Sequence, residues 1–251
     1  MIVILAAIVI GLSLGLFGSG GSILTVPVLL YLLNMPAQVA IASSLLIVAG
    51  ISAFGSIQNA FKQLISWRHV IWFGLPGMLG TYAGAWIGTL VEPVWQLLLF
   101  SALMLVAAFF MWRHQAQPET NSHRLQPVRI GIDGLVVGAI TGFVGVGGGF
   151  LIVPALVLLG GLNMPLAVGT SLVVIALKSV VGFSKYYSVL VSQGNTFNWS
   201  SIVIIILAGI AGSYIGKAIG QHLPVRLMQK GFAIFLVGMA MLVIYQTAVT
   251  A

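Results

Sequence analysis

A glycine-rich pattern occurs twice along this chain, and that duplication constrains the fold more than any other feature. Six positions of a first block recur 127 residues further on: Gly11, Gly15, Gly18, Gly20, Gly21 and Pro27 reappear as Gly138, Gly142, Gly145, Gly147, Gly148 and Pro154. A second block, from Trp67 to Gly88, recurs 132 residues further on, from Trp199 to Gly220. So many matches in the same order indicate two related structural units joined in one chain.

The amino-acid composition places those units in a lipid bilayer. Hydrophobic residues make up 60% of the 251 positions and charged residues only 5%, against about 45–50% and about 25% in an ordinary soluble domain. Ten basic and three acidic side chains cannot cover a soluble particle of this size, but they suffice if most of the surface faces lipid. We therefore expect an all-α membrane protein, a polytopic bundle of about eight to ten transmembrane or half-membrane helices.

A polar linker separates the two repeats. Residues 113–127 form the only markedly polar stretch, which assigns 1–112 to the first transmembrane repeat and 128–251 to the second. Each repeat divides into five apolar segments, predicted at 2–17, 22–33, 37–60, 68–90 and 94–112, and at 129–144, 149–162, 166–190, 199–220 and 225–247.

The second segment of each repeat is too short for a full crossing. As a helix, residues 22–33 would be about 18 Å long, whereas the hydrocarbon core is about 30 Å thick. Such an element is broken or re-entrant, and the glycines before it must lie within protein or line a water-filled cavity.

The basic residues predict how the repeats are oriented. Lys62 and Arg68 follow the third segment of the first repeat, whereas Arg226 and Lys230 follow the fourth segment of the second repeat. By the positive-inside rule, the repeats are inverted and the linker 113–127 is cytoplasmic. Both termini are then outside, in a multi-pass protein of the plasma (inner) membrane.

The glycine breaks and nearby hydroxyls are candidate anion ligands. Glycine permits tight turns, and the helix that follows presents unpaired N–H groups with a positive dipole end. The alternative is that these glycines only allow close helix packing and that the hydroxyls bond to carbonyls of their own helices. The candidate substrate-binding positions are Gly18, Gly20, Gly21, Ser22, Ser43, Ser44, Gly147, Gly148, Gly149, Thr170 and Ser171. For the second block, from Trp67 to Gly88, helix packing is the favoured interpretation.

Lys178 completes the candidate site. It lies in the middle of segment 166–190, and the spacing of seven places Ser171, Lys178 and Lys185 on one helix face. An ionisable group at that depth costs a few kcal/mol or more and marks a pathway or binding site by default. The alternative is a lysine that snorkels or pairs with backbone carbonyls.

The cysteine, histidine, net-charge and acidic-residue content of the sequence argues against several classes of function. Without cysteine, and with its four histidines near predicted loops, the chain offers no metal cluster, no cofactor site and no catalytic residues, so we expect no enzyme. The net charge of +7 is scattered rather than gathered in a basic run, which argues against nucleic-acid binding. Only Asp133 among the acidic residues could enter the membrane, as a proton-coupling group or an interfacial acid, which argues against a carboxylate-rich cation pathway.

The same residues also resemble a family. The glycine break leading to a proline helix (Gly145 to Pro154) and Gly169-Thr170-Ser171-Leu172 are similar to the TauE/SafE sulfite exporter family of permeases. The resemblance implies secondary transport of small sulfur-containing anions, of the sulfite, sulfonate, sulfoacetate or thiosulfate class, driven by a proton or ion gradient. The first repeat departs from this form, with Ala42-Ser43-Ser44 at the corresponding place.

Rival functions stay open at this point. An anion channel could use the same positive site, and a structural membrane subunit or an intramembrane enzyme would need partners or groups that the sequence does not display. The expected partners are a small anionic substrate, the lipid bilayer and a coupling proton or ion. A homo-oligomer and the direction of transport also stay open.

Overall fold

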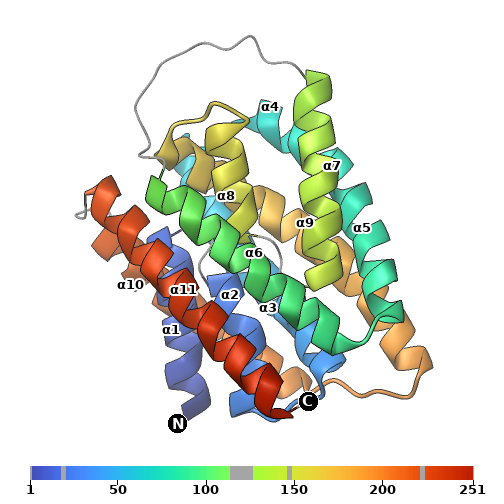
Figure 1. Ribbon diagram of the computed structural model, residues 1–251. Coiled ribbons are helices and arrows are strands. Elements are labelled where there is room, and N and C mark those ends of the chain that lie inside the picture. Colours follow the sequence, from blue (N-terminus) through green and yellow to red (C-terminus); the bar gives the residue numbers. More distant parts are fainter. Residues whose placement is uncertain (1, 18–20, 114–126, 146–148, 221–223, 251) are drawn as a thin grey trace.

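The computed structural model describes residues 2–17, 21–113, 127–145, 149–220 and 224–250 (Figure 1). Every regular element in these ranges is helical, which confirms the all-α fold class. The helices are α1 Ile2–Phe17, α2 Gly21–Pro27, η1 Val28–Leu32, α3 Ala37–Phe61, α4 Trp67–His69, η2 Val70–Gly74, α5 Leu75–Leu90, α6 Pro93–Arg113, α7 Pro127–Val144, α8 Gly149–Leu158, α9 Met164–Ser192, α10 Trp199–Gly220 and α11 Val225–Thr250.

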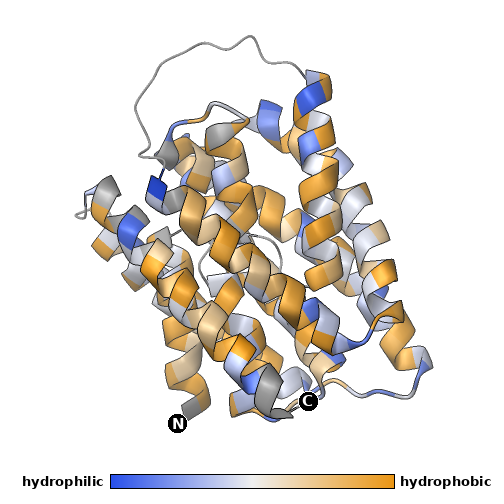
Figure 2. Cartoon of the chain, viewed as in Figure 1, coloured by the Kyte–Doolittle hydropathy of each residue, from blue (hydrophilic) through white to orange (hydrophobic). Residues whose placement is uncertain are grey.

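These helices have the lengths and surfaces of a multi-pass membrane protein. Within the described residues, six stretches are long and apolar enough to cross a bilayer. Large hydrophobic side chains face outward, as Leu79 (71% exposed) and Leu207 (63% exposed) illustrate. Figure 2 shows hydrophobic residues along the helices and hydrophilic residues mainly toward their ends.

The ten predicted segments correspond to the observed elements with three differences. The segment predicted at 68–90 is divided into α4, the π-helix η2 and α5. The segment predicted at 149–162 ends as a helix at Leu158, because Gly160 and Gly161 follow and Gly161 has a φ of +67°. The segment predicted at 22–33 changes after Pro27 to the wider π-helix η1, since proline lacks an N–H for the regular ladder.

Helices α3 and α9 form the centre of the bundle and run antiparallel. Gly55 of α3 lies against Leu172 of α9, and Leu45 lies against Gly182, so positions increase along one helix as they decrease along the other. The apolar windows of these helices are 67% and 61% buried, more than those of the other spanning stretches described. Of the spanning stretches described, α3 and α9 are therefore the most enclosed by protein.

Two glycine-lined helix pairs flank this centre. In the pair α5 and α7, a Cβ added to Gly138 would collide with Gly77 O, and in the pair α1 and α10, a Cβ added to Gly11 would collide with Gly209 O. Backbone meets backbone because no Cβ intervenes, which confirms helix packing as the role of the second glycine block. Each pair, like the pair α6 and α11, joins a helix of residues 1–113 to one that follows Pro127.

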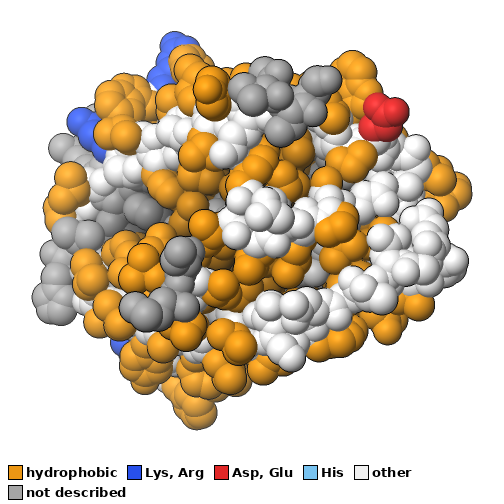
Figure 3. Space-filling model, turned by 90° about the horizontal axis from the view of Figure 1, so that it is seen from below, with side chains coloured by type: hydrophobic (Ala, Val, Ile, Leu, Met, Phe, Trp, Pro, Cys, Tyr) orange, Lys and Arg blue, Asp and Glu red, His pale blue; other side chains and the backbone are white. Residues whose placement is uncertain are grey.

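The two ends of the bundle differ in charge. At one end, Lys217 Nζ donates to Asn59 Oδ1 (2.9 Å), near Lys62, and Lys230 Nζ lies 5.9 Å from the centre of the Trp112 ring. We call this the basic end; the ends of α6 and α10 and the start of α7 lie there (Figure 1). Both described termini lie at the opposite end, whose surface is almost free of charged groups (Figure 3).

Candidate anion site in the helical core

Lys178 is a buried lysine at the middle of α9. It is 1% exposed, its Nζ donates to Gly134 O of α7 (3.3 Å), and it lies 4.4 Å from the centre of the Phe73 ring. No acidic side chain in the described ranges lies within ion-pair distance of this amine. Among the described residues, a carbonyl dipole and an aromatic face are the groups that stabilise a protonated amine here, so it retains capacity for an anion.

The α5–α7 glycine interface makes room for this lysine. A Cβ on Gly77 would collide with Lys178 Cε and Nζ, and it would lie 2.9 Å from Gly134 O. Because Gly77 has no side chain, a slot remains beside it, and the lysine amine fills this slot.

Ser43 and Ser44 lie near the opposite end of the α3–α9 core from Thr170. Both serines are fully buried, and Ser44 Oγ is placed to donate to Ile41 O (2.7 Å) or to Gly145 O (2.9 Å). Ser43 Oγ has no hydrogen-bond partner within the described structure. An unsatisfied buried hydroxyl is unusual and is available to a ligand.

Gly145, the first residue of the second glycine break, has a backbone conformation that requires glycine. Its φ is +70°, and a Cβ there would collide with Ile41 of α3. Only glycine can adopt this backbone conformation at that distance from α3. The chain leaving α7 is thereby held against the serine-bearing part of α3.

Thr170 and Ser171 lie elsewhere, beside the loop that follows α3. Thr170 Oγ1 accepts a hydrogen bond from Ser66 N (2.9 Å), and Ser171 Oγ donates to Val168 O of its own helix (2.8 Å). Because α3 and α9 are antiparallel, Ser171 lies roughly 15 Å or more from Ser44 along the core, at 1.5 Å for each residue. The structure does not bring the four hydroxyls into one cluster.

Of the candidate glycine-break residues, three are described. Gly21 and Ser22 begin α2, Gly149 begins α8, and all three are buried. Gly21 packs back on α1, where an added Cβ would lie 2.5 Å from Ile10 O. Gly18, Gly20, Gly147 and Gly148 lie outside the described residues.

A polar cluster that the sequence did not predict adjoins the Ser44–Gly145 contact. Gln96 Nε2 donates to Gly88 O (2.5 Å) and to Tyr186 OH (3.1 Å), and Tyr186 OH donates to Phe143 O (3.1 Å). Gln96 and Tyr186 are fully buried, and Gln96 Oε1 has no partner among the described atoms. The available signal was an amide inside an otherwise apolar segment, which is costly in a membrane unless it is paired.

The other polar candidates are dispersed. Lys185 lies 5.4 Å from the centre of the Tyr82 ring, and Asp133 is half-buried on α7 with Oδ2 unpaired in the described structure. His69 contacts Ser66 Oγ (2.8 Å) and Gly160 O (3.1 Å). No group of three or more potential metal-binding side chains occurs within the described ranges.

Comparison with known proteins identifies the family. The sequence model described as sulfite exporter TauE/SafE matches residues 3–243. The chain belongs to this family. It is 31% identical to a probable membrane transporter protein of Xylella fastidiosa strain Temecula1 over 245 residues, covering 95% of this chain and 92% of that protein.

Other relatives bear the same description. A probable membrane transporter protein of Haemophilus influenzae is 29% identical, with 96% of each chain covered, and YunE of Bacillus subtilis is 25% identical over 98% of this chain and 97% of its own length. No solved structure matches this chain. The TauE/SafE relationship and the long apolar helices make the protein a multi-pass membrane transporter with a small-molecule substrate.

Proposed function

We propose that this transporter moves small sulfur-containing anions, of the sulfite, sulfonate, sulfoacetate or thiosulfate class, across the plasma membrane, without catalysing their conversion. The observation that carries the proposal is Lys178, an amine buried on α9 with no carboxylate partner in the described structure. The family description, sulfite exporter, supports the sulfur chemistry of the substrate.

The energetics of Lys178 favour an anionic substrate. A charged lysine at such depth costs at least about 2.5–3.5 kcal/mol, and one carbonyl and one aromatic ring offset only part of that cost. A bound anion would accept N–H bonds from the amine and neutralise it. The charged amine and the anion then stabilise each other where neither would be stable alone.

The buried hydroxyl groups offer the anion further binding contacts along the same core. Lys178 lies on α9 between the position of Thr170 and Ser171 and the position facing Ser43 and Ser44. An anion that moves along α9 would meet hydroxyl donors before and after the lysine. We propose these positions as successive contacts for the anion.

The proposal includes the internal symmetry and the orientation. Residues 1–112 and 128–251 would be inverted repeats, and their relative motion would expose the site alternately to each side. The basic end, with Lys62 and Lys230, would be cytoplasmic, as would the linker, and both termini would be outside. A proton or another ion would drive the cycle.

Flux into proteoliposomes tests the substrate class. The purified protein should give saturable uptake of radiolabelled sulfite, thiosulfate or a sulfonate, and the unlabelled anion should compete. A folded protein that transports none of these anions would refute the proposal. Currents that exceed carrier turnover by orders of magnitude would instead favour an anion channel.

A matched lysine pair tests the site. Lys178→Met keeps the length of the side chain but removes the charge, so we expect uptake to fall at least tenfold. Lys185→Met changes the same helix seven residues away, beside Tyr82 rather than in the core, and should retain most of the uptake. Equal uptake by two folded variants would exclude Lys178 from substrate binding.

A further inference from the structure

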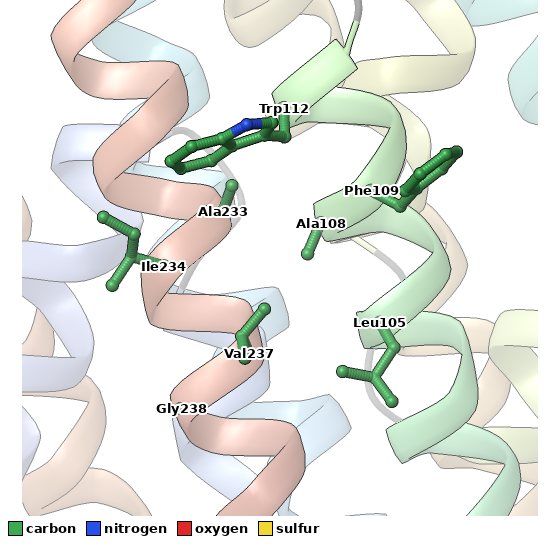
Figure 4. A pocket seen from close by; sticks show the side chains of 8 residues that line it. All are labelled: Leu105, Ala108, Phe109, Trp112, Ala233, Ile234, Val237 and Gly238. Atoms are coloured by element: carbon green, nitrogen blue, oxygen red, sulfur yellow. The ribbon is translucent and has the colours of Figure 1, made fainter.

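An apolar groove runs between α6 and α11, and none of the candidate site residues lines it. It has a volume of about 550 Å³, and its walls are aliphatic or small side chains with Phe109 and Trp112 on α6 and Gly238 on α11 (Figure 4). The two helices lie together on one face of the bundle (Figure 1). In the membrane, such a groove faces hydrocarbon, and it is suited to a single flexible chain.

One end of the groove is charged. Trp112 lines the groove, Arg113 follows it directly, and Lys230 Nζ lies 5.9 Å from the centre of the Trp112 ring. Arg113 and Lys230 are exposed. The basic side chains therefore stand beside an indole, the amphipathic ring that prefers the headgroup level of a bilayer.

We propose that the α6–α11 groove binds an anionic phospholipid, with an acyl chain in the groove and the phosphate group against Arg113 and Lys230. The order of side-chain types along the surface identifies the occupant. Hydrocarbon contacts occupy the membrane-buried part, an amphipathic ring follows, and two cations lie at the end. A basic pocket between transmembrane helices recognises anionic headgroups in this way.

A second copy of the chain fits this surface less well. A two-fold axis along the membrane normal would bring Arg113 and Lys230 of both copies to the same end of the interface, and their like charges would repel. Of the described acidic residues, Glu92 precedes α6 at the opposite end and Asp133 is half-buried on α7. Neither offers a counter-charge to that patch, whereas a phosphate group does.

Native mass spectrometry of the full-length protein tests the proposal, with phosphatidylglycerol and phosphatidylcholine of identical acyl chains as probes. We expect the unmodified protein to retain phosphatidylglycerol preferentially. The variant Arg113→Gln combined with Lys230→Gln should lose about 30-fold in affinity for phosphatidylglycerol, at roughly fivefold for each basic residue near a headgroup, and little for phosphatidylcholine. Lys62→Gln, which removes a charge at the same end but away from the groove, should leave the preference unchanged.

A second variant tests the acyl-chain contact independently. Gly238 has open space where a Cβ would be, so Gly238→Leu fills the groove without disturbing the fold. It should weaken retention of both lipids at least fivefold. Ala211→Leu adds bulk at an exposed position of α10 and is the control. Thermal unfolding of each variant checks that it is folded.

Three outcomes would overturn the proposal. One is equal retention of the two lipids by the unmodified protein. Another is a headgroup variant that behaves like Lys62→Gln. The third is a two-chain complex that Gly238→Leu dissociates while lipid retention stays constant, since the groove would then be a contact between copies.

Discussion

The close contact between α7 and α5 lets us predict how much one added methyl group, in Gly138→Ala, destabilises the protein. A Cβ on Gly138 would lie 2.9 Å from both Gly77 Cα and Gly77 C, and closer still to Gly77 O. Gly131, on the same helix seven residues earlier, is the matched control. Its nearest atoms would be Pro76 Cγ and Trp72 O, each at 3.6 Å, which is ordinary van der Waals contact.

The expected size of the effect follows from these distances. Relieving the Gly138→Ala contact requires Gly77 Cα and C to move from 2.9 Å to at least 3.4 Å from the new Cβ. Gly77 O must move further still, and all three are backbone atoms, which cannot change rotamer. Overpacking of this kind costs about 1–3 kcal/mol. Alanine gains at most about 1 kcal/mol over glycine in a helix, so Gly131→Ala should be neutral or slightly stabilising.

Thermal unfolding of the detergent-solubilised protein measures the difference. At roughly 2–4 °C for each kcal/mol in a chain of this size, Gly138→Ala should lower Tm by about 2–12 °C, whereas Gly131→Ala should not lower it. Size-exclusion chromatography before heating confirms that both variants are folded. Equal Tm values, or a larger loss for Gly131→Ala, would refute the close approach of Gly138 to Gly77. The slot for Lys178 is formed by the same interface, so it would be refuted as well.

Two further predictions concern the polar cluster of Gln96 and Tyr186 and the orientation of the protein in the membrane. Tyr186→Phe should destabilise the protein by about 1–2 kcal/mol, because Gln96 Nε2 and Phe143 O lose a buried partner, and an unchanged Tm would contradict that cluster. Because the chain contains no cysteine, single substitutions Lys62→Cys and Glu92→Cys allow labelling with an impermeant maleimide in intact cells. Only the second should react from outside, and the reverse pattern would invalidate the proposed orientation.

The helices could be predicted from the sequence because their limits are local signals. Polar or glycine- and proline-containing turns bound each apolar run, and the second copy of the pattern provided a check on the first. The ends of α3 and α9 were predicted within two residues of their observed positions. The early end of α8 was missed since it depends on the backbone conformation of Gly161.

The candidate site was less predictable because it depends on register between distant helices. Ser44 and Ser171 are equivalent in the sequence pattern, yet the antiparallel contact of α3 and α9 places them at different heights. Gln96 of α6 and Tyr186 of α9 meet only because both side chains reach Gly88, near the end of α5. Lys178 was found from sequence since a charge in an apolar run stands out without any knowledge of its neighbours.

Helices of the first part of the chain pack against helices of the second part, and this pairing constrains how the chain can fold. Glycine faces of α1 and α5, in the first part of the chain, are covered by α10 and α7, in the second part. Either part alone would leave these faces and the inner surface of α3 or α9 without their protein contacts, and lipid cannot reproduce backbone-to-backbone packing. We therefore expect fragments 1–112 and 113–251 to copurify when they are coexpressed, and each to aggregate or be degraded when expressed alone. A fragment 1–112 that purifies alone as a stable, monodisperse species would contradict this interdependence, and co-elution of the two fragments at equal stoichiometry is the measurement that supports it.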